Sequence, residues 1–358
     1  TRALARPVSL ADAPFTPVPV ATFDEPWALA FLPDGRLLVT EKKGVLRLVE
    51  PTSGRVDAIG GVPPVDYGGQ GGLGDVALHP RFASNGLVYL SYAEAGGDDT
   101  RGAAVARARL VLDARGGGTL ADRTVIWRQQ PKVGGRGHYG HRLLFGPDGR
   151  LWISSGERQK FTPAQDLDAS LGKILRLDAD GHALTDNPFA AAGGVAAQVW
   201  SLGHRNPLGI AFDAADRLSV VEMGPAGGDE LNLVERGANY GYPIVSNGDH
   251  YDGRAIPDHP THPEFAAPAL WWTPVISPSS LVIYSGTAFP DWRGDALISG
   301  LSSGAIGRVR FDGTKAREAE RYEMGRRMRG LRQSPSGELW AIEDGAGGRL
   351  LRLVPRPR

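Results

Sequence analysis

The chain repeats one pattern of hydrophobic and polar positions six times. An apolar stretch runs into a turn rich in Pro, Asp, Asn, Ser or Gly, and a second short β-rich run follows. Each repeat predicts a β-hairpin, because alternating or wholly apolar runs flank a tight turn. The repeats occupy residues 28–40, 76–92, 143–154, 210–221, 287–299 and 331–342.

A further run that alternates apolar residues with Arg follows several of these hairpins, at residues 45–49, 174–177, 306–311 and 350–353. The leucine after each turn returns at uneven intervals of about 60 residues, longer than in the tightest propeller repeats. Six degenerate units therefore predict an all-β fold, a six-bladed β-propeller of four-stranded antiparallel blades. A β-sandwich with coincidental turns is the alternative.

We expect a single propeller domain over residues 1–358, with residues 1–14 as an extended N-terminal segment. Insertions are expected near 112–130 and 247–272, and a short helix at 166–171. The 49 Gly and 27 Pro exceed average usage, and no low-complexity run holds them, so they must lie in turns.

Composition narrows the classes of function. The 40 basic and 40 acidic side chains balance, which argues against a polybasic nucleic-acid binder. The absence of Cys excludes disulfides, thiolate metal sites and Cys nucleophiles. No run of 18 apolar residues occurs, so no membrane span is expected. The chain starts at Thr1 without an apolar leader, and we expect a periplasmic or secreted protein whose signal peptide has been removed.

Glycine-bearing polar loops are the candidate binding segments, because ligands of propellers bind at the axial mouth on loops between blades. These loops are residues 66–75, 134–142, 203–209, 222–230, 239–243 and 326–330. The first contains GQGGLG and presents Gln70, without the strand–turn–helix context of a nucleotide cradle.

His138 is the histidine that suits a general base, because it follows flexible glycines and precedes an apolar strand. A surface histidine is the alternative. Strand alternation is expected to turn His141 away from the mouth or leave it at the rim. His259 and His262 resemble a metal pair but lack a third ligand, and we interpret them, with His79 and His182, as structural or solvated.

Arg205, Asn206, Arg327 and Arg329 could form a pocket for a ligand with several carboxylates, since Arg pairs with carboxylate bidentately. Solvated arginines at strand edges are the alternative. Residues 222–230 offer carboxylates and backbone turns suited to calcium, although their acidic spacing is not that of an EF-hand.

Six segments occur in a familiar order: PWALAFLPDGRLLVTEKKG, GGQGGLGDVALHP, HYGHRLLFGPDG, GHRNPLGIAF, GPAGGDELNLVERGANYGYP and RMR. Together they closely resemble the soluble quinoprotein aldose (glucose) dehydrogenase family, which uses pyrroloquinoline quinone (PQQ). The resemblance runs from about Pro26 to Leu353. The family is a six-bladed propeller, in agreement with the repeats.

The resemblance implies that His138 is the base that takes the substrate hydroxyl proton while hydride passes to the quinone. Arg205 would lie close to a quinone carbonyl, and Arg327 and Arg329 would pair with the quinone's carboxylates. The positions implied to hold the cofactor are Gln70, Arg205, Asn206, Tyr251, Ser302, Arg327 and Arg329.

The resemblance also implies two calcium sites. The main-chain oxygens of Gly224 and Pro225 would ligate the calcium that helps bind and polarise the quinone. Glu230 and the carbonyl of Tyr240 would hold a second calcium. Both expectations agree with the preference of calcium for hard oxygen ligands.

Two positions depart from the family pattern. Ser302 stands where many relatives carry Lys or Arg, which weakens one cofactor contact, and Gly137 stands where the best-known glucose enzyme has a sugar-binding Asp. We therefore expect a dehydrogenase that oxidises small aldose sugars to lactones and leave the sugar, the electron acceptor and the oligomeric state open. A non-catalytic carbohydrate-binding or scaffold propeller is the main alternative, and a calcium-dependent lactonase is a lesser one.

Overall fold

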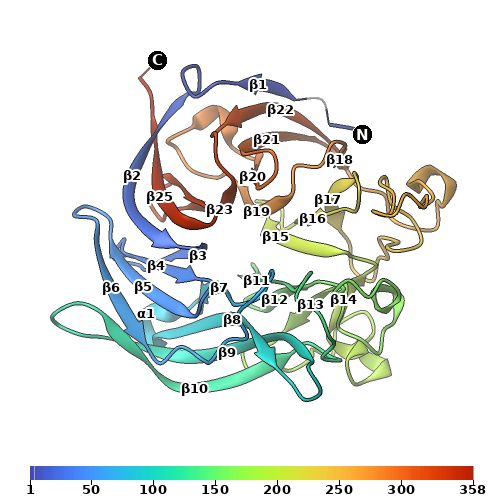
Figure 1. Cartoon of the computed structure of the whole chain (residues 1–358), viewed down its shortest axis with the longest axis horizontal. Helices are drawn as coiled ribbons and strands as arrows, with labels where there is room; N and C mark the ends of the chain where they lie inside the picture. Colours follow the sequence, from blue (N-terminus) through green and yellow to red (C-terminus); the bar gives the residue numbers. More distant parts are fainter. Residues whose placement is uncertain (4, 358) are drawn as a thin grey trace.

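Short apolar strands joined by tight turns make up most of the computed structural model, which describes residues 1–3 and 5–357 (Figure 1). The prediction of an all-β fold is confirmed. Within the described part of the chain the only α-helix is α1 (Phe82–Asn85), beside 3-10 turns at Thr162–Gln165, Ala190–Ala192, Ala196–Gln198, His259–Thr261 and Pro290–Trp292. The helix expected at 166–171 is wrong, because those residues form turns after the 3-10 helix.

Most strands fall into antiparallel units of four in chain order. The first two units are β3 (Pro26–Phe31), β4 (Leu37–Glu41), β5 (Val45–Glu50), β6 (Arg55–Gly60), and β7 (Leu73–Leu78), β8 (Leu87–Ala95), β9 (Arg101–Leu112), β10 (Gly118–Arg128). A short parallel pairing of β6 with β10 joins these two units into one eight-stranded sheet. The next two are β11 (Gly140–Phe145), β12 (Leu151–Ser155), β13 (Lys173–Leu177), β14 (Val199–Leu202), and β15 (Asn206–Phe212), β16 (Leu218–Met223), β17 (Asp229–Val234), β18 (Leu270–Trp272).

Both ends of the chain complete the remaining sheets. Strands β19 (Pro278–Ile283), β20 (Ala296–Gly300), β21 (Ala305–Asp312) and β22 (Lys315–Glu323) gain β1 (Arg6–Val8), which pairs parallel with β22. Strands β23 (Met328–Gln333), β24 (Leu339–Glu343) and β25 (Ala346–Pro355) gain β2 (Phe15–Asp24), which pairs antiparallel with β25. The expected segment 1–14 therefore includes β1, and its residue 4 lies outside the described residues.

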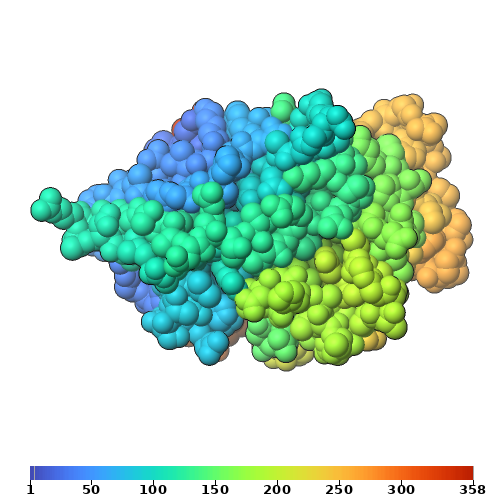
Figure 2. Space-filling view, turned by 90° about the horizontal axis from the view of Figure 1, so that it is seen from below, coloured from blue at the N-terminus to red at the C-terminus, as the bar shows by residue number. Residues whose placement is uncertain are grey.

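The units stand around a centre, as Figure 1 shows, with the first strand of each unit innermost. Each of these strands contacts the first strand of the next unit, and β23 contacts β3, so the ring is closed. The prediction of an insertion at 112–130 is wrong, because this stretch contains β10, the fourth strand of its unit, which pairs with β9 through two register shifts. In the side view of Figure 2 the β9–β10 hairpin protrudes at one end, and residues between β17 and β18 form a lobe at the other.

Apolar side chains fill the space between neighbouring units. Tyr89, Leu143 and Ile153 belong to one buried cluster, and Trp152 and Ile210 belong to the next. Because alternate residues of a strand face opposite sides of a sheet, each unit contributes to the clusters on both of its sides. Burial of these side chains at about 25 cal/mol per Å² is the main force that holds the units together.

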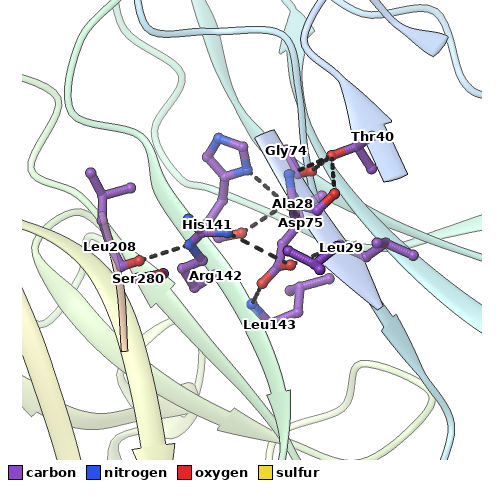
Figure 3. Close-up of polar contacts among 12 residues, drawn as sticks. Ala28, Leu29, Thr40, Gly74, Asp75, His141, Arg142, Leu143, Leu208 and Ser280 are labelled. Carbon is purple, nitrogen blue, oxygen red and sulfur yellow. Dashed lines mark hydrogen bonds and ion pairs between the residues drawn. The ribbon is translucent and has the colours of Figure 1, made fainter. Parts of the chain in front are cut away.

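Polar contacts tie the innermost strands together at the centre (Figure 3). Arg142 on β11 is buried, and its guanidinium donates to the carbonyl of Leu208 on β15 at 2.7 Å and to the carbonyl of Ser279 on β19. Asp75 on β7 accepts from the amide of Leu143 at 2.8 Å. This network closes the floor beneath the loops that carry the candidate site.

Candidate active site

A cavity of about 410 Å³ opens among the loops at one end of the innermost strands, a size typical of small-molecule sites. Most positions singled out from the sequence line it: Gln70, His138, Arg205, Asn206, Gly224, Pro225, Tyr251, Arg327 and Arg329. Three others, Ser302, Glu230 and Tyr240, are outside the lining. The fold thus brings together residues that lie far apart in the chain.

His138 is fixed by a buried carboxylate that the sequence did not single out. Its Nδ1 is hydrogen-bonded to the Oε1 of Glu157, and the two side chains are 7% and 0% exposed. The backbone amide of His138 donates to Gln70 Oε1 at 2.8 Å. Because a carboxylate only accepts, the proton of a neutral His138 sits on Nδ1, and Nε2 keeps a free lone pair.

Left-handed backbone shapes the segments that carry this pair. His138 has φ +50°, and Arg158, Gln159 and Phe161, which follow Glu157, have φ from +60° to +65°. Such values are uncommon for residues other than glycine and cluster at functional sites. Buried Arg158 donates to the carbonyl of Gly137 at 2.9 Å, which ties the two segments together.

Burial sets the protonation of the pair. It lowers the pKa of His138 below its ordinary value, and the hydrogen bond to Glu157 opposes this only in part. Burial alone would raise the pKa of Glu157, but His138 and the amide of Phe161 outweigh it, so this pKa is lowered. A neutral imidazole therefore faces an ionised carboxylate near pH 7.

Arg205 lines the same cavity as His138, and part of its guanidinium is hydrogen-bonded to the backbone. Its Nη1 donates to the carbonyls of Met223 at 3.0 Å and Gly224 at 2.6 Å, whereas its buried Nε has no hydrogen-bond partner among the described residues. An unpaired buried donor is costly, and a bound acceptor would relieve that cost. Asn206 is buried beside it, with Oδ1 accepting from the amide of Gly140 at 3.2 Å.

Arg329 on β23 and Arg327, two residues earlier and just before that strand, share one counter-ion. Their Nε atoms donate to the two oxygens of Asp344, each at 2.9 Å. Arg327 is 57% exposed, but Arg329 is mostly buried. Burial would raise the pKa of Asp344, and the two arginines, Arg329 first, more than offset this. Lys42, which the sequence did not single out, adds a further cation to the lining.

Ser302 is exposed and does not line the cavity, but it contacts two residues that do. Its hydroxyl bonds the hydroxyl of Ser277 at 2.9 Å and the carbonyl of Val275 at 3.3 Å, and Ser277 and Val275 line the cavity in its place. The exposed ring of Tyr251 lies at the mouth, 5.6 Å from the guanidinium carbon of Arg205. The two positions thus occupy the outer edge of the site.

Glu230 belongs to a separate buried polar cluster. Its carboxylate accepts from Asn232 Nδ2 at 3.1 Å and lies 3.2 Å from His259 Nε2. The same Asn232 amide donates to Glu222 at 2.8 Å, and Asn232 Oδ1 has no partner among the described residues. Burial, with repulsion from Glu222, raises the pKa of Glu230. Tyr240 packs nearby, its ring stacked on His204.

The residues missed by sequence reasoning are Glu157, Asp344, Lys42 and His141. Glu157 comes two residues after the end of β12, and a carboxylate just beyond an apolar strand, near a candidate base, is a signal the sequence does contain. His141 was expected to turn away from the mouth or to lie at its rim, and this prediction is wrong. It has φ +54°, lines the cavity and is 2% exposed, because a register shift between Gly140 and Leu143 interrupts the alternation of β11.

The class of protein follows from comparison with known families. Residues 23–352 match the family described as glucose / sorbosone dehydrogenase. The chain belongs to this family of oxidoreductases.

Individual relatives and solved structures are also sugar dehydrogenases. The chain is 38% identical over 341 residues to aldose sugar dehydrogenase YliI of Escherichia coli, with 93% of this chain and 91% of the relative covered. The PQQ-bound structure of the aldose sugar dehydrogenase from Streptomyces coelicolor is 30% identical, with a TM-score of 0.77 and coverage of 94% and 96%. The apo structure of the soluble E. coli enzyme gives 36% identity and a TM-score of 0.88, with coverage of 96% and 100%.

The described residues contain no helix with the length and apolar character needed to cross a membrane.

Proposed function

We propose that this chain is a PQQ-dependent aldose sugar dehydrogenase that oxidises the anomeric hydroxyl of an aldose to the lactone. The observation that carries the proposal is the His138–Glu157 pair, buried in the wall of the same cavity into which Lys42 and three arginines converge. The relative from Streptomyces that was solved with PQQ supports the cofactor.

We also infer that the antiparallel units are the six blades of one propeller domain spanning residues 1–358. The closed ring of contacts among β3, β7, β11, β15, β19 and β23 supports this count. The eight-stranded sheet then represents two blades joined by the short β6–β10 pairing. In this reading the cavity lies at the axial mouth, where propellers bind ligands.

The residues present fit the quinone. PQQ is flat and carries three carboxylates, and Arg205, Arg327, Arg329 and Lys42 offer the cations to hold them. The unpaired Nε of buried Arg205 is the donor that a quinone oxygen would satisfy. When bound, PQQ supplies a two-electron acceptor, so the protein itself needs no redox group. Gln70, whose Oε1 is used by His138, keeps its amide protons for the ligand.

His138 performs the proton transfer in this proposal. Glu157 would hold the tautomer in which Nε2 is free, and Nε2 would take the proton of the anomeric hydroxyl; bound PQQ would be the acceptor of the two electrons and the hydrogen lost from C1. The ionised carboxylate then stabilises the imidazolium. Gly137 beside it offers no side chain to select one sugar, so we do not extend the proposal to glucose specificity.

We propose that calcium binds at two sites. The carbonyl oxygens of Gly224 and Pro225 are the ligands proposed at the cavity, where a divalent cation would add to the positive field on the quinone. In the second place, Glu230 and the carbonyl of Tyr240 are the proposed ligands. The partnerless Asn232 Oδ1 and the repulsion of Glu230 by Glu222 fit a cation there.

A non-catalytic propeller is the second candidate, and Ser302 is the observation that favours it. Without a basic side chain at that position, the cavity has one cation fewer than many relatives. Lys42 in the lining is a further cation that a carboxylate-bearing ligand could use, which favours the enzyme. A periplasmic or secreted location and an electron acceptor of unknown identity stay predictions.

Reconstitution tests the proposal. Purified apoprotein is mixed with PQQ and calcium and assayed with an electron-accepting dye over a panel of aldoses. Quinone binding with sugar-dependent dye reduction supports the enzyme, and chelation of calcium should weaken quinone binding. Sugar binding without quinone binding would favour the non-catalytic propeller instead.

A further inference from the structure

His141 occupies the floor of the cavity. Its ring stacks on Trp27, with centroids 4.9 Å apart and planes 10° from parallel, and meets the edge of Tyr139 at 6.0 Å. Gly74 provides the room, because a Cβ there would overlap the imidazole. The ring is therefore held in one place by packing on several sides.

The hydrogen bonds of Ser91 fix which ring nitrogen carries the proton. The Ser91 hydroxyl oxygen lies 2.7 Å from the carbonyl oxygen of His141 and 2.7 Å from its Nδ1, and it accepts from the amide of Asp75 at 2.8 Å. The hydroxyl has one proton, and a carbonyl can only accept, so that proton goes to the carbonyl. Nδ1 must then be the donor to Ser91, which leaves Nε2 without a proton.

Nε2 has no protein partner in the described part of the chain, and in Figure 3 it is the ring nitrogen that points away from the network. Burial, followed by the charges of Arg142, Arg158 and Arg329, lowers the pKa of His141 to about 3. The ring thus stays neutral across the ordinary pH range, and Nε2 accepts hydrogen bonds without taking up a proton.

We propose that His141 binds the ligand of this cavity directly, with Nε2 accepting a hydrogen bond from an N–H or O–H group. The inference rests on the proposed function, because the ligand would be either the quinone, through its pyrrole N–H, or the sugar, through a hydroxyl. His141 differs in role from His138, since the buried network beneath it permits acceptance of a hydrogen bond only. It is a binding residue, and the proton is taken at His138.

The test reads the ring directly by ¹⁵N NMR of histidine-labelled apoprotein. We expect a protonated Nδ1 and an unprotonated Nε2 for His141, and a shift of the Nε2 resonance toward the hydrogen-bonded range when ligand is added. PQQ with calcium is titrated first. A methyl glycoside, which cannot be oxidised at the blocked anomeric position, is titrated separately. The titration that moves Nε2 identifies the donor.

A matched pair of variants gives the energetic readout. His141→Asn keeps a residue type that tolerates left-handed backbone but is too short to replace Nε2. We expect it to weaken equilibrium binding of the identified ligand by roughly 2- to 10-fold, the range for one neutral hydrogen bond. His182→Asn, at a side chain 76% exposed on the surface, should leave binding unchanged.

Two results would overturn the inference: a proton on Nε2 in the apoprotein, or bound PQQ and bound glycoside that both leave Nε2 unmoved. If His141→Asn does not fold, the NMR measurement on the unmodified protein still decides. Failure of the proposed function looks different, because PQQ would then show no binding to the unmodified protein by its own absorbance.

Discussion

The two walls of the cavity are built in different ways. The base wall, residues 137–141 and 157–161, is mostly loop backbone that enters β11 at Gly140; several of its residues are left-handed, and it carries buried His138 and Glu157. The arginine wall is formed by Arg329 on β23, Arg327 just before that strand and Asp344 just after β24. The base wall thus fixes atoms tightly, whereas the arginine wall supplies charge at a half-open edge.

The difference separates chemistry from binding. A base must be within hydrogen-bond reach of one proton, so a small displacement is expensive. A cation that pairs with a carboxylate acts over a longer distance and tolerates movement of its side chain. We therefore expect changes in the base wall to act on turnover and changes in the arginine wall to act on affinity for the quinone.

The largest effect is expected from His138→Ala. Removal of the base should lower the rate at saturating sugar by roughly 10²–10⁴-fold. Affinity for PQQ should change little, because His138 faces the substrate hydroxyl in this proposal. Steady-state kinetics of the fully loaded enzyme, with a separate quinone titration, measure the two quantities. A loss of quinone affinity with turnover preserved would show that the walls have been assigned the wrong way round.

Glu157→Gln should act on the same step more weakly. The amide can donate to Nδ1 and so favours the wrong tautomer, and we expect turnover to fall roughly 10- to 100-fold, as for other residues that orient a catalytic group. The carboxylate opposes the lowering of the His138 pKa, so its neutralisation should lower that pKa further. The base works when neutral, and the acid limb of the pH–rate profile should therefore move to lower pH. An acid limb that does not move would argue that Glu157 does not control the pKa of His138.

Arg327→Ala should show the opposite pattern. We expect roughly tenfold weaker PQQ binding and a smaller change in turnover once the enzyme carries the quinone. The loss of affinity is modest for a charged contact because the Arg327 side chain is 57% exposed and solvent screens its charge. Equilibrium titration of apoprotein with the quinone gives the affinity. The matched control is Arg254→Ala, whose exposed arginine pairs locally with Asp252; equal effects of the two variants would remove Arg327 from the site.

Tyr251→Ala should have the smallest effect. The exposed ring at the mouth makes one cation–π contact with Arg205, a contact that contributes about 0.5–1 kcal/mol when exposed. A twofold to fivefold change in KM for the sugar or in PQQ affinity is expected, with the rate at saturation intact. A large fall in that rate would place Tyr251 at the reacting atoms.

More of the arginine wall than of the base wall could be predicted from the sequence. Alternation along residues 326–330 places Arg327 and Arg329 on one side of a strand, and both line the cavity. Their counter-ion Asp344 could not be deduced, because only the pairing of β23 with β24 brings it near.

Strand alternation could not predict the geometry of the base wall. Alternation assumes extended backbone, and it fails at His141, where φ is +54° and the β11–β12 register shifts. The all-β fold, by contrast, could be read from turn chemistry alone, because each apolar run carries its own turn signal.

The pairing of β2 with β25, which completes the sheet of β23 and β24, affects the order in which the protein can fold. Strand β2, near residue 20, has its partner β25 near residue 350, so most of the described chain lies between the two strands. The sheet that contains β23 and Arg329 is therefore completed only once β25 is available, however early the other sheets assemble. Its formation requires contact between residues near opposite ends of the chain, the slowest kind of contact to form. If the proposed function holds, quinone binding by the arginine wall therefore depends on this long-range contact.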